Sequence, residues 1–299
     1  MAVTLTTVLP EQAEAVGVLM YKSFRDIAER HNFEPAFRTP EFAQVVVRLL
    51  AQTEGYESYL LVEDGQPLAC NFGDERDEVI GVGPVAVAVD QQGRGLGRRV
   101  MEALLERADQ GGFASVRLVQ AAYNMQSFSL YHKLGFEVKD ALASLHGRPP
   151  DDEAPSDLVR EYTPADLDAC DTPHRDVLGI GRRHDIEYMA NFAPPVVVER
   201  DGQVAGYLTR FPGDEAFVMH GAARDERALR DLIIGTARAV PGEMRLTLPT
   251  GQPETLRWAL GGGQPAARPG GFRLMELGTY MVRGDYQAPM GAWISSPFY

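Results

Sequence analysis

A glycine-rich segment between an apolar run and an amphipathic helix has the residue types that bind phosphate groups. The segment is Gln92-Gly-Arg-Gly95-Leu-Gly97-Arg98, and it follows the apolar residues 85–89. Such a turn before a helix leaves several backbone N–H groups without partners, with the positive end of the helix dipole behind them. These groups together form an anion site suited to phosphate. Glycine matters because a Cβ would block close approach or strain the backbone.

The glycine spacing distinguishes between known phosphate-binding motifs. The dinucleotide fingerprint G-x-G-x-x-G fails, because counting from Gly93 and Gly95 its third glycine position holds Arg98. The P-loop fails as well, since no Gly-Lys-Ser/Thr follows. These failures disfavour a nucleotide-dependent kinase or dehydrogenase. The segment does fit Q-x-x-G-x-G, from Gln92 through Gly95 to Gly97.

This spacing resembles the acetyl-CoA pyrophosphate motif of the GNAT acetyltransferase superfamily. Downstream, the strand-like Val116-Arg-Leu-Val119 is followed by Asn124 and then by Leu130-Tyr131-His-Lys-Leu-Gly135-Phe136. That order is similar to the family's strand, asparagine and L-Y-x-K-x-G-F segment. The resemblance covers residues from about 3 to 145. It implies an α/β fold with a mixed sheet and acetyl-CoA as co-substrate.

The resemblance also implies a role for each matching residue. The backbone of residues 85–87 would pair with the pantetheine arm like an added strand. Asn124 would contact the cofactor, cap the helix that it begins, or do both. Tyr131 stands where the family often keeps a general acid for the departing thiolate; the alternative is a core aromatic. The residues expected to contact the cofactor are Val85, Ala86, Val87, Gln92, Gly93, Arg94, Gly95, Leu96, Gly97, Arg98 and Asn124.

The implied reaction is direct attack of a neutral primary amine on a thioester in a ternary complex. A backbone N–H near Val87 would stabilise the developing oxyanion, and most of the catalysis would come from holding the reactants together. Asp74 and Glu75 are candidate general bases, with a solvated acidic loop as the alternative. The histidines show no metal-ligand spacing, so no metal is expected.

The elements that would position this site alternate between strands and helices. Periodicity and turn signals predict a helix that begins at Pro10 and a hairpin that turns at Asp64-Gly65. The full set is a strand at 3–8, the helix from Pro10, a helix at 40–51, strands at 58–63, 67–72 and 83–89, a helix at 95–110, a strand from 113 to 120, a helix at 124–134 and a strand from 135.

The second half repeats part of this pattern. We expect a catalytic domain at 1–147, a proline-rich linker at 148–156 and a second domain at 157–299. Residues 197–206 echo the first hairpin, and a helix is expected from 224 to 239. Gly221 is the only glycine between the expected strand and this helix, and no Q-x-x-G-x-G motif occurs there. The second domain is therefore interpreted as a degenerate GNAT-like fold without its own cofactor. The aromatic tail at 286–299 is expected to pack on the body or across a subunit boundary.

Composition limits the partners. The net charge of −13 disfavours nucleic acid and anionic membranes, and two cysteines without a CxxC fit a reducing cytoplasm. Neither a signal peptide nor a transmembrane run is recognised. The expected protein is a cytoplasmic acetyltransferase acting on a small-molecule amine, with a homodimer possible. The alternative is a non-catalytic acyl-CoA sensor or interaction module.

Overall fold

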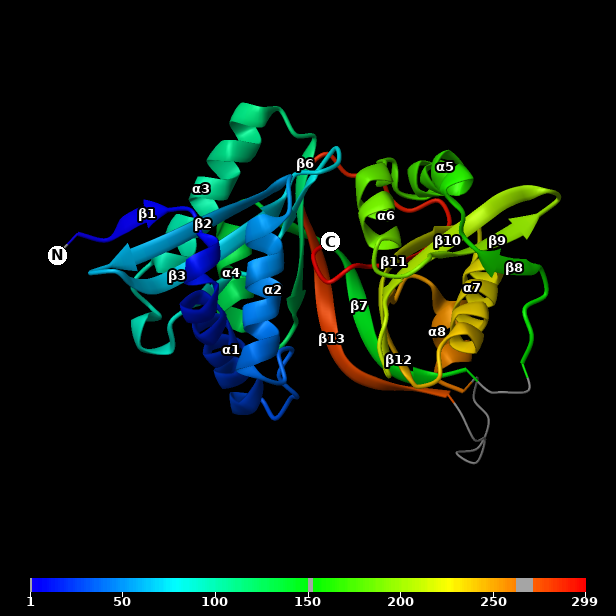
Figure 1. The fold of residues 1–299 in the computed structure, drawn as a ribbon, viewed down its shortest axis with the longest axis horizontal. Coiled ribbons are helices and arrows are strands. Elements are labelled where there is room, and N and C mark those ends of the chain that lie inside the picture. Colours follow the sequence, from blue (N-terminus) through cyan, green and yellow to red (C-terminus); the bar gives the residue numbers. More distant parts are fainter. Residues whose placement is uncertain (1, 150–152, 262–270) are drawn as a thin grey trace. The chain divides into compact units, whose positions relative to one another are not determined.

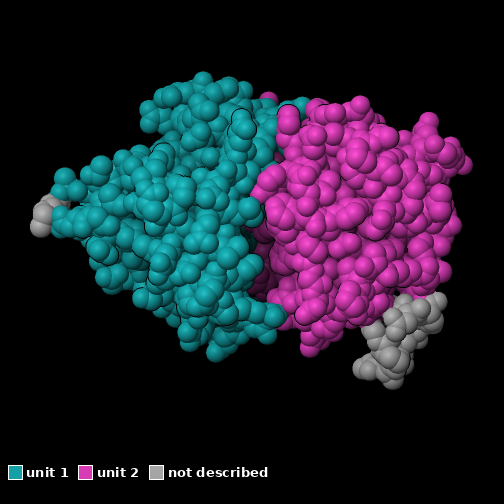
Figure 2. All heavy atoms as spheres, in the orientation of Figure 1, with its two compact units in different colours: residues 1–137, 282–284, 298 teal, residues 138–281, 285–297, 299 magenta. Residues whose placement is uncertain are grey.

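The computed structural model describes residues 2–149, 153–261 and 271–299. The chain divides into two compact units, coloured separately in Figure 2. Unit 1 comprises residues 1–137, 282–284 and 298, and unit 2 comprises 138–281, 285–297 and 299. In the part of the chain described, no helix is long and apolar enough to cross a membrane.

The division between the units differs from the expected domains at 1–147 and 157–299. The cause is β7 (Glu137–Arg148), which pairs with β12 (Met244–Pro249) from Leu142 to Gly147. These backbone hydrogen bonds make β7 part of the sheet of unit 2, ahead of the proline-rich linker. The boundary therefore falls between residues 137 and 138, and residues 282–284 and 298 return to unit 1.

Unit 1 is a mixed sheet with helices packed against it (Figure 1). Its strand order is β1-β2-β3-β4-β6, with β5 also pairing with β3. Only β4 and β6 are parallel neighbours in this set. The elements are β1 (Thr4–Thr6), α1 (Ala13–Arg30), α2 (Pro40–Gln52), β2 (Tyr56–Glu63), β3 (Gln66–Asp74), β4 (Ile80–Val82), β5 (Ala86–Val87), α3 (Leu96–Gly111), β6 (Ser115–Ala121) and α4 (Met125–Lys133).

The hairpin of β2 and β3 sits where the Asp64-Gly65 signal placed it. Both turn residues have positive φ, 53° and 79°, as a tight hairpin turn requires. Alternation along β2 then sends neighbouring side chains to opposite faces of the sheet. Leu60 packs in the cluster with α1 and α2, and Leu61 packs in the cluster that includes the start of α3.

The strand expected at 83–89 is wrong as a single element. Only the short strand β5 lies in that range, β4 ends before it at Val82, and Val89 lies in a 3-10 turn (Val89–Gln91). Pro84 lies between the two strands and has no N–H to donate to a ladder. The chain consequently pairs with β3 at Gly73–Asp74 and again, with a shifted register, at Ala69–Cys70.

Unit 2 repeats the order of elements of unit 1: strand, two helices, hairpin, strand, helix, strand and short helix. Its strands are ordered β7-β12-β11-β10-β9-β8, and β14 pairs with β11. The expected helix at 224–239 is confirmed as α7. The remaining elements are β8 (Leu158–Glu161), α5 (Leu167–Leu178), α6 (Arg183–Ala190), β9 (Val196–Arg200), β10 (Gln203–Phe211), β11 (Ala216–Ala223), α7 (Glu226–Ala239), α8 (Pro253–Ala259), β13 (Gly271–Gly284) and β14 (Ala292–Ile294).

Two substitutions on α3 test its packing on the sheet. Leu104 is fully buried on α3, next to Gly73 of β3, so Leu104→Ala should lower the free energy of unfolding by about 2–5 kcal/mol. Glu106→Ala, an exposed position on the same helix, should change it by less than about 0.5 kcal/mol. Urea unfolding of both variants is the measurement, and equal losses would contradict the packing.

Candidate functional site

The parting of two neighbouring strands opens the sheet of unit 1. β4 and β6 are parallel neighbours from the pair Ile80–Val116 to the pair Val82–Leu118. Beyond this point β5 pairs with β3, while β6 continues to Ala121. Among the described residues, β5 therefore has no strand along its other edge.

The open edge of β5 presents backbone hydrogen-bonding groups. Ala88 N–H donates to the Leu68 carbonyl at 2.8 Å, which makes these two residues a hydrogen-bonded pair. Antiparallel ladders alternate, so the next pair, Ala69 and Val87, is not hydrogen-bonded. The N–H and C=O of Val87 consequently face away from β3. Val85, two residues earlier, presents the same edge.

The loop after β5 ends in a helix start with unsatisfied donors. Gly93 and Gly95 have φ of 80° and 79°, and Gly95 is the N-cap of α3 without any side-chain cap. The first backbone bond of the helix runs from Arg99 N–H to the Gly95 carbonyl at 3.2 Å. The N–H groups of residues 96–98 therefore have no acceptor within the helix. No acidic residue occupies the first turn, which leaves its positive end available to an anion.

Gly97 is the point where three parts of the predicted motif meet. A Cβ built on Gly97 would lie 3.4 Å from Val87 Cγ2 and 3.7 Å from Leu130 Cδ2. Leu130 immediately precedes Tyr131 on α4. The fold thus brings the start of α3, the open edge of β5 and the helix of Tyr131 together.

The arginines around the loop are exposed or half-buried and engaged locally. Arg94 donates to the Gln91 side chain, Arg98 pairs with Glu102 at 3.2 Å, and Arg99 donates to the Val3 carbonyl at 3.2 Å. Surface pairs of this kind contribute little stability. A bound phosphate could therefore draw these guanidinium groups to itself at little cost.

Asn124 caps α4, as one of its two expected roles required. Its Oδ1 accepts a hydrogen bond from Ser127 N–H at 3.1 Å. This cap uses only the oxygen of the amide group, so the Nδ2 donor can serve a ligand. Capping and ligand contact are thus compatible in this geometry.

The Tyr131 side chain is buried like a core aromatic, and its phenol is protonated, as a proton donor must be. Its side chain is 7% exposed and packs edge-on against Phe136, with ring centroids 5.9 Å apart. Burial raises the pKa of the Tyr131 phenol to about 12, so the hydroxyl keeps its proton at neutral pH. Packing and proton donation remain compatible.

The two candidate general bases are held by arginines. Arg76 binds both carboxylate oxygens of Asp74, at 2.7 and 2.6 Å, and Arg107 binds Glu75 at 2.9 Å. Arg107 lies eleven residues beyond Leu96 on α3, or roughly 16 Å along the helix from the glycine loop. This placement favours structural ion pairs over a base beside the thioester.

The histidines considered for metal binding lie in unit 2. His220 is fully buried, with Nδ1 3.0 Å from the Tyr207 hydroxyl and Nε2 3.1 Å from Asp185 Oδ2. His174 Nδ1 lies 2.8 Å from the Ile180 carbonyl. No group of three or more potential metal ligands occurs within the described ranges.

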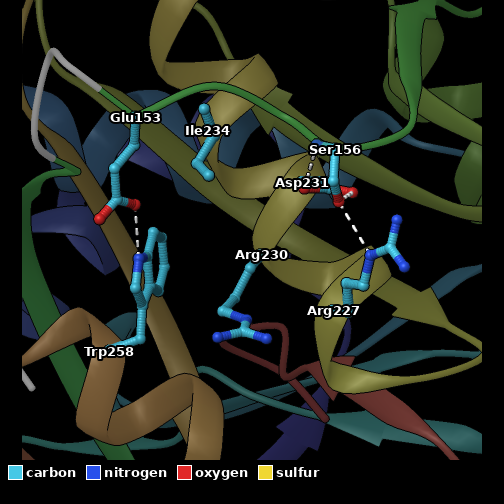
Figure 3. Close-up of a pocket in the computed structure, with 7 residues that line it drawn as sticks. All are labelled: Glu153, Ser156, Arg227, Arg230, Asp231, Ile234 and Trp258. Atoms are coloured by element: carbon cyan, nitrogen blue, oxygen red, sulfur yellow. Dashed lines mark hydrogen bonds between the residues drawn. The ribbon is translucent and has the colours of Figure 1, made fainter.

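Two cavities lie away from the glycine loop. The first, of about 330 Å³, is in unit 2 between residues 153–156 of the linker and the helices α7 and α8 (Figure 3). Figure 3 shows that its polar groups largely bond to one another: Trp258 Nε1 donates to Glu153 at 2.6 Å, and Ser156 donates to Asp231 at 2.8 Å. The second, of about 290 Å³, lies at the far end of α3, near Asp109 and Arg283. Neither coincides with the predicted site.

Comparison with known protein families bears on this geometry. Residues 11–136 match the family model described as the acetyltransferase (GNAT) family. Residues 11–136 form a GNAT-family domain. The match includes the glycine loop, Asn124 and Tyr131, and it supports acyl transfer as the general chemistry. No curated protein sequence matches the chain significantly.

Solved structures share the fold over nearly the whole chain. A provisionally assigned acetyltransferase from Pyrococcus horikoshii is 17% identical, with a TM-score of 0.72 over 99% of this chain and 95% of its own. A GCN5-related N-acetyltransferase from Sphaerobacter thermophilus is 16% identical, with a TM-score of 0.66 over 96% of each chain. At these identities the similarity shows the fold. A GNAT fold of mixed α/β class is therefore established.

Substitution of two glycines with the same backbone conformation distinguishes an effect on ligand binding from an effect on stability. Gly95 and Gly65 both have φ of 79° and open space where a Cβ would point. Gly95→Ala and Gly65→Ala should each lower the free energy of unfolding by about 1 kcal/mol. Only Gly95→Ala should weaken acetyl-CoA binding measured by calorimetry, because only Gly95 shapes the loop. Equal affinities for the two variants would argue against the loop as the site.

Burial of Tyr131 predicts a pH-dependent contribution to stability. Its folded pKa of about 12 exceeds the ordinary value of 10.0, so folding favours the protonated phenol. This contribution is complete below pH 10 and is lost as the pH rises to about 12. Relative to Tyr131→Phe, the wild-type chain should lose about 2–3 kcal/mol over this range in urea unfolding. A constant difference between the two would show that the phenol is not desolvated.

Proposed function

We propose that the chain is an N-acetyltransferase that transfers the acetyl group of acetyl-CoA to a primary amine of a small molecule. The observation that carries this proposal is the convergence at Gly97 of the glycine loop, the open edge of β5 and the helix of Tyr131. The net charge of −13 favours the approach of a cationic amine over an anionic acceptor. Location in the cytoplasm remains part of the proposal.

The residues around the loop fit acetyl-CoA. The N–H groups of residues 96–98 and the glycine turn before them would form a cradle for a diphosphate, and the Arg98 guanidinium, now paired with Glu102, would have to turn toward it. The outward groups of Val87 suit an extended amide-containing arm, which would add to β5 like a strand. Asn124 Nδ2, at the start of α4, would add a further donor.

The chemistry then follows from what each group can donate. Acetyl-CoA supplies a thioester whose carbonyl carbon the amine nitrogen attacks as the C–S bond breaks. Val87 N–H would donate to the carbonyl oxygen as negative charge develops there. Tyr131 would donate its phenolic hydrogen to the departing sulfur, and the proton released by the amine would restore the balance.

The pKa of Tyr131 constrains its role. A thiol ordinarily has a pKa near about 8.5, well below the value of about 12 for this phenol. Full proton transfer ahead of C–S cleavage would therefore be unfavourable. Tyr131 would act chiefly by a hydrogen bond that strengthens as sulfur becomes negative.

A second candidate function is a non-catalytic acyl-CoA sensor. The observation that favours it is the pairing of Asp74 and Glu75 with arginines, which engages both candidate bases in ion pairs. An enzyme with this site would need an amine that arrives neutral or loses its proton through water. A sensor would need neither.

Release of free thiol from acetyl-CoA across a panel of small primary amines tests the proposal. At least one amine should be acetylated, and Tyr131→Phe should lower kcat by roughly 10²-fold with little change in acetyl-CoA affinity. Gly97→Leu, which fills the meeting point of β5 and α4, should bind no acetyl-CoA and serves as the negative control.

Two outcomes would count against this function. Tight acetyl-CoA binding without transfer to any amine would favour the sensor. A Tyr131→Phe variant with unchanged kcat would remove the tyrosine from the mechanism and leave it as a core aromatic.

A further inference from the structure

Unit 2 contains the same parting of strands as unit 1. β11 and β12 are parallel neighbours at the pairs Ala216–Met244 and Phe217–Arg245, and then diverge. In the sequence, residues 221–223 follow Ala216 by the same number of positions as residues 85–87 follow Ile80. On the other strand, Gln252 follows Met244 by eight residues, as Asn124 follows Val116, and each precedes a short helix. Residues 221–223 and Gln252 are thus the counterparts of residues 85–87 and Asn124.

The backbone of β11 faces the same way as that of β5. Arg224 N–H donates to the Ala205 carbonyl at 2.9 Å, as Ala88 N–H donates to Leu68 in unit 1. By the alternation of antiparallel ladders, the peptide groups of Gly221 and Ala223 therefore face away from β10. These are the groups that correspond to the open edge of β5.

In unit 2 this edge is occupied by the C-terminal segment of the chain. β14 pairs antiparallel with β11, from Gly221–Ile294 to Ala223–Ala292. Ser295 N–H, just beyond β14, donates to the Thr247 carbonyl of β12 at 3.1 Å. One short stretch of chain therefore bonds to both of the strands that have parted.

Gln252 binds that segment with its whole amide group. Its Nε2 donates to the Trp293 carbonyl at 2.7 Å, and its Oε1 accepts from Trp293 N–H at 2.6 Å. Gln252 is 4% exposed and Trp293 is 2% exposed, so both bonds are shielded from water. The position that Asn124 holds in unit 1 is thus used in unit 2 to recognise a peptide.

The start of α7 carries its own anion. Asp225 is the N-cap, accepts from Ala228 N–H at 2.8 Å and pairs with Arg200 at 2.6 Å, and Glu226 lies in the first turn. Only residues 224–225 connect β11 to α7, whereas residues 88–95 connect β5 to α3. A carboxylate therefore stands where unit 1 presents bare N–H groups, and a diphosphate would be repelled.

Two further residues of the tail are anchored on the same unit. Ser296 and Tyr299 are nearly fully buried, and Arg182 donates to the Ser296 hydroxyl and to the Tyr299 carbonyl, both at 3.2 Å. The Arg182 guanidinium also lies 3.9 Å from the centre of the Tyr299 ring. Of the two expectations for the tail, packing on the body is the one that the structure has.

We propose that unit 2 is a strand-accepting site whose ligand is the chain's own segment 292–296. The segment is held by β11, β12 and Gln252 in the place that corresponds to the pantetheine arm in unit 1, so the chain binds one acyl-CoA. The comparison with pantetheine rests on the proposed function. The peptide site itself rests only on the contacts of unit 2.

Two counterpart substitutions in the full-length chain test the proposal. Gln252→Ala should raise hydrogen exchange of the amides at 292–296 by about tenfold and leave acetyl-CoA affinity unchanged. Asn124→Ala should do the opposite, weakening acetyl-CoA while the tail amides keep their protection. Tail exchange that does not respond to Gln252→Ala, or two acetyl-CoA equivalents per wild-type chain in calorimetry, would overturn it.

A nicked chain tests whether the segment behaves as a ligand. With a protease site inserted between the exposed residues Gln287 and Ala288, the cleaved tail should stay bound through gel filtration. A synthetic peptide of residues 291–299 should exchange into the site, and the same peptide with an N-methyl group on the Trp293 amide should bind about tenfold more weakly. Immediate release of the tail, or equal binding of both peptides, would refute the site. Absence of acetyl-CoA binding would refute the proposed function but would not affect the conclusion about the peptide site in unit 2.

Discussion

The central constraint is that backbone hydrogen-bonding groups need partners where a sheet opens. When two parallel strands part, the inner edge of one strand and the N–H groups of the next helix lose the neighbours that a continuous sheet would give them. Unit 1 leaves these groups exposed along β5 and at the start of α3. In the proposed function their convergence, rather than any single catalytic side chain, would hold a long anionic ligand.

The two units meet this constraint differently. Unit 1 uses Gly95 as a bare helix cap, which leaves the positive end of α3 open. Unit 2 caps α7 with Asp225, bridges the parted strands with β14 and satisfies Trp293 with Gln252. In each case a group of the protein bonds to the backbone where a ligand could otherwise bind, so these backbone groups of unit 2 all have partners within the unit. A shared framework thus leaves a strand edge open in one unit and pairs the corresponding edge with the chain's own tail in the other.

Much of this could be predicted from the sequence because local signals dominated. The Asp64-Gly65 hairpin, the amphipathic helix α3 and the glycine turn before it depend on residues close together in the chain, and they occur as expected. The break at Pro84 was missed because it depends on strand pairing between distant segments. The role of Gln252 was also missed. No local motif marks Gln252. Its equivalence to Asn124 becomes visible only when residues are counted from the parallel strand pair of each unit.

The most direct test of the central claim is the backbone amide NMR spectrum during titration with coenzyme A. If the start of α3 binds the diphosphate, the amide resonances of residues 93–98 should shift together and saturate at one equivalent, while those of residues 226–228 at the start of α7 stay in place. Saturable shifts at α7, or none at residues 93–98 despite binding, would contradict the account.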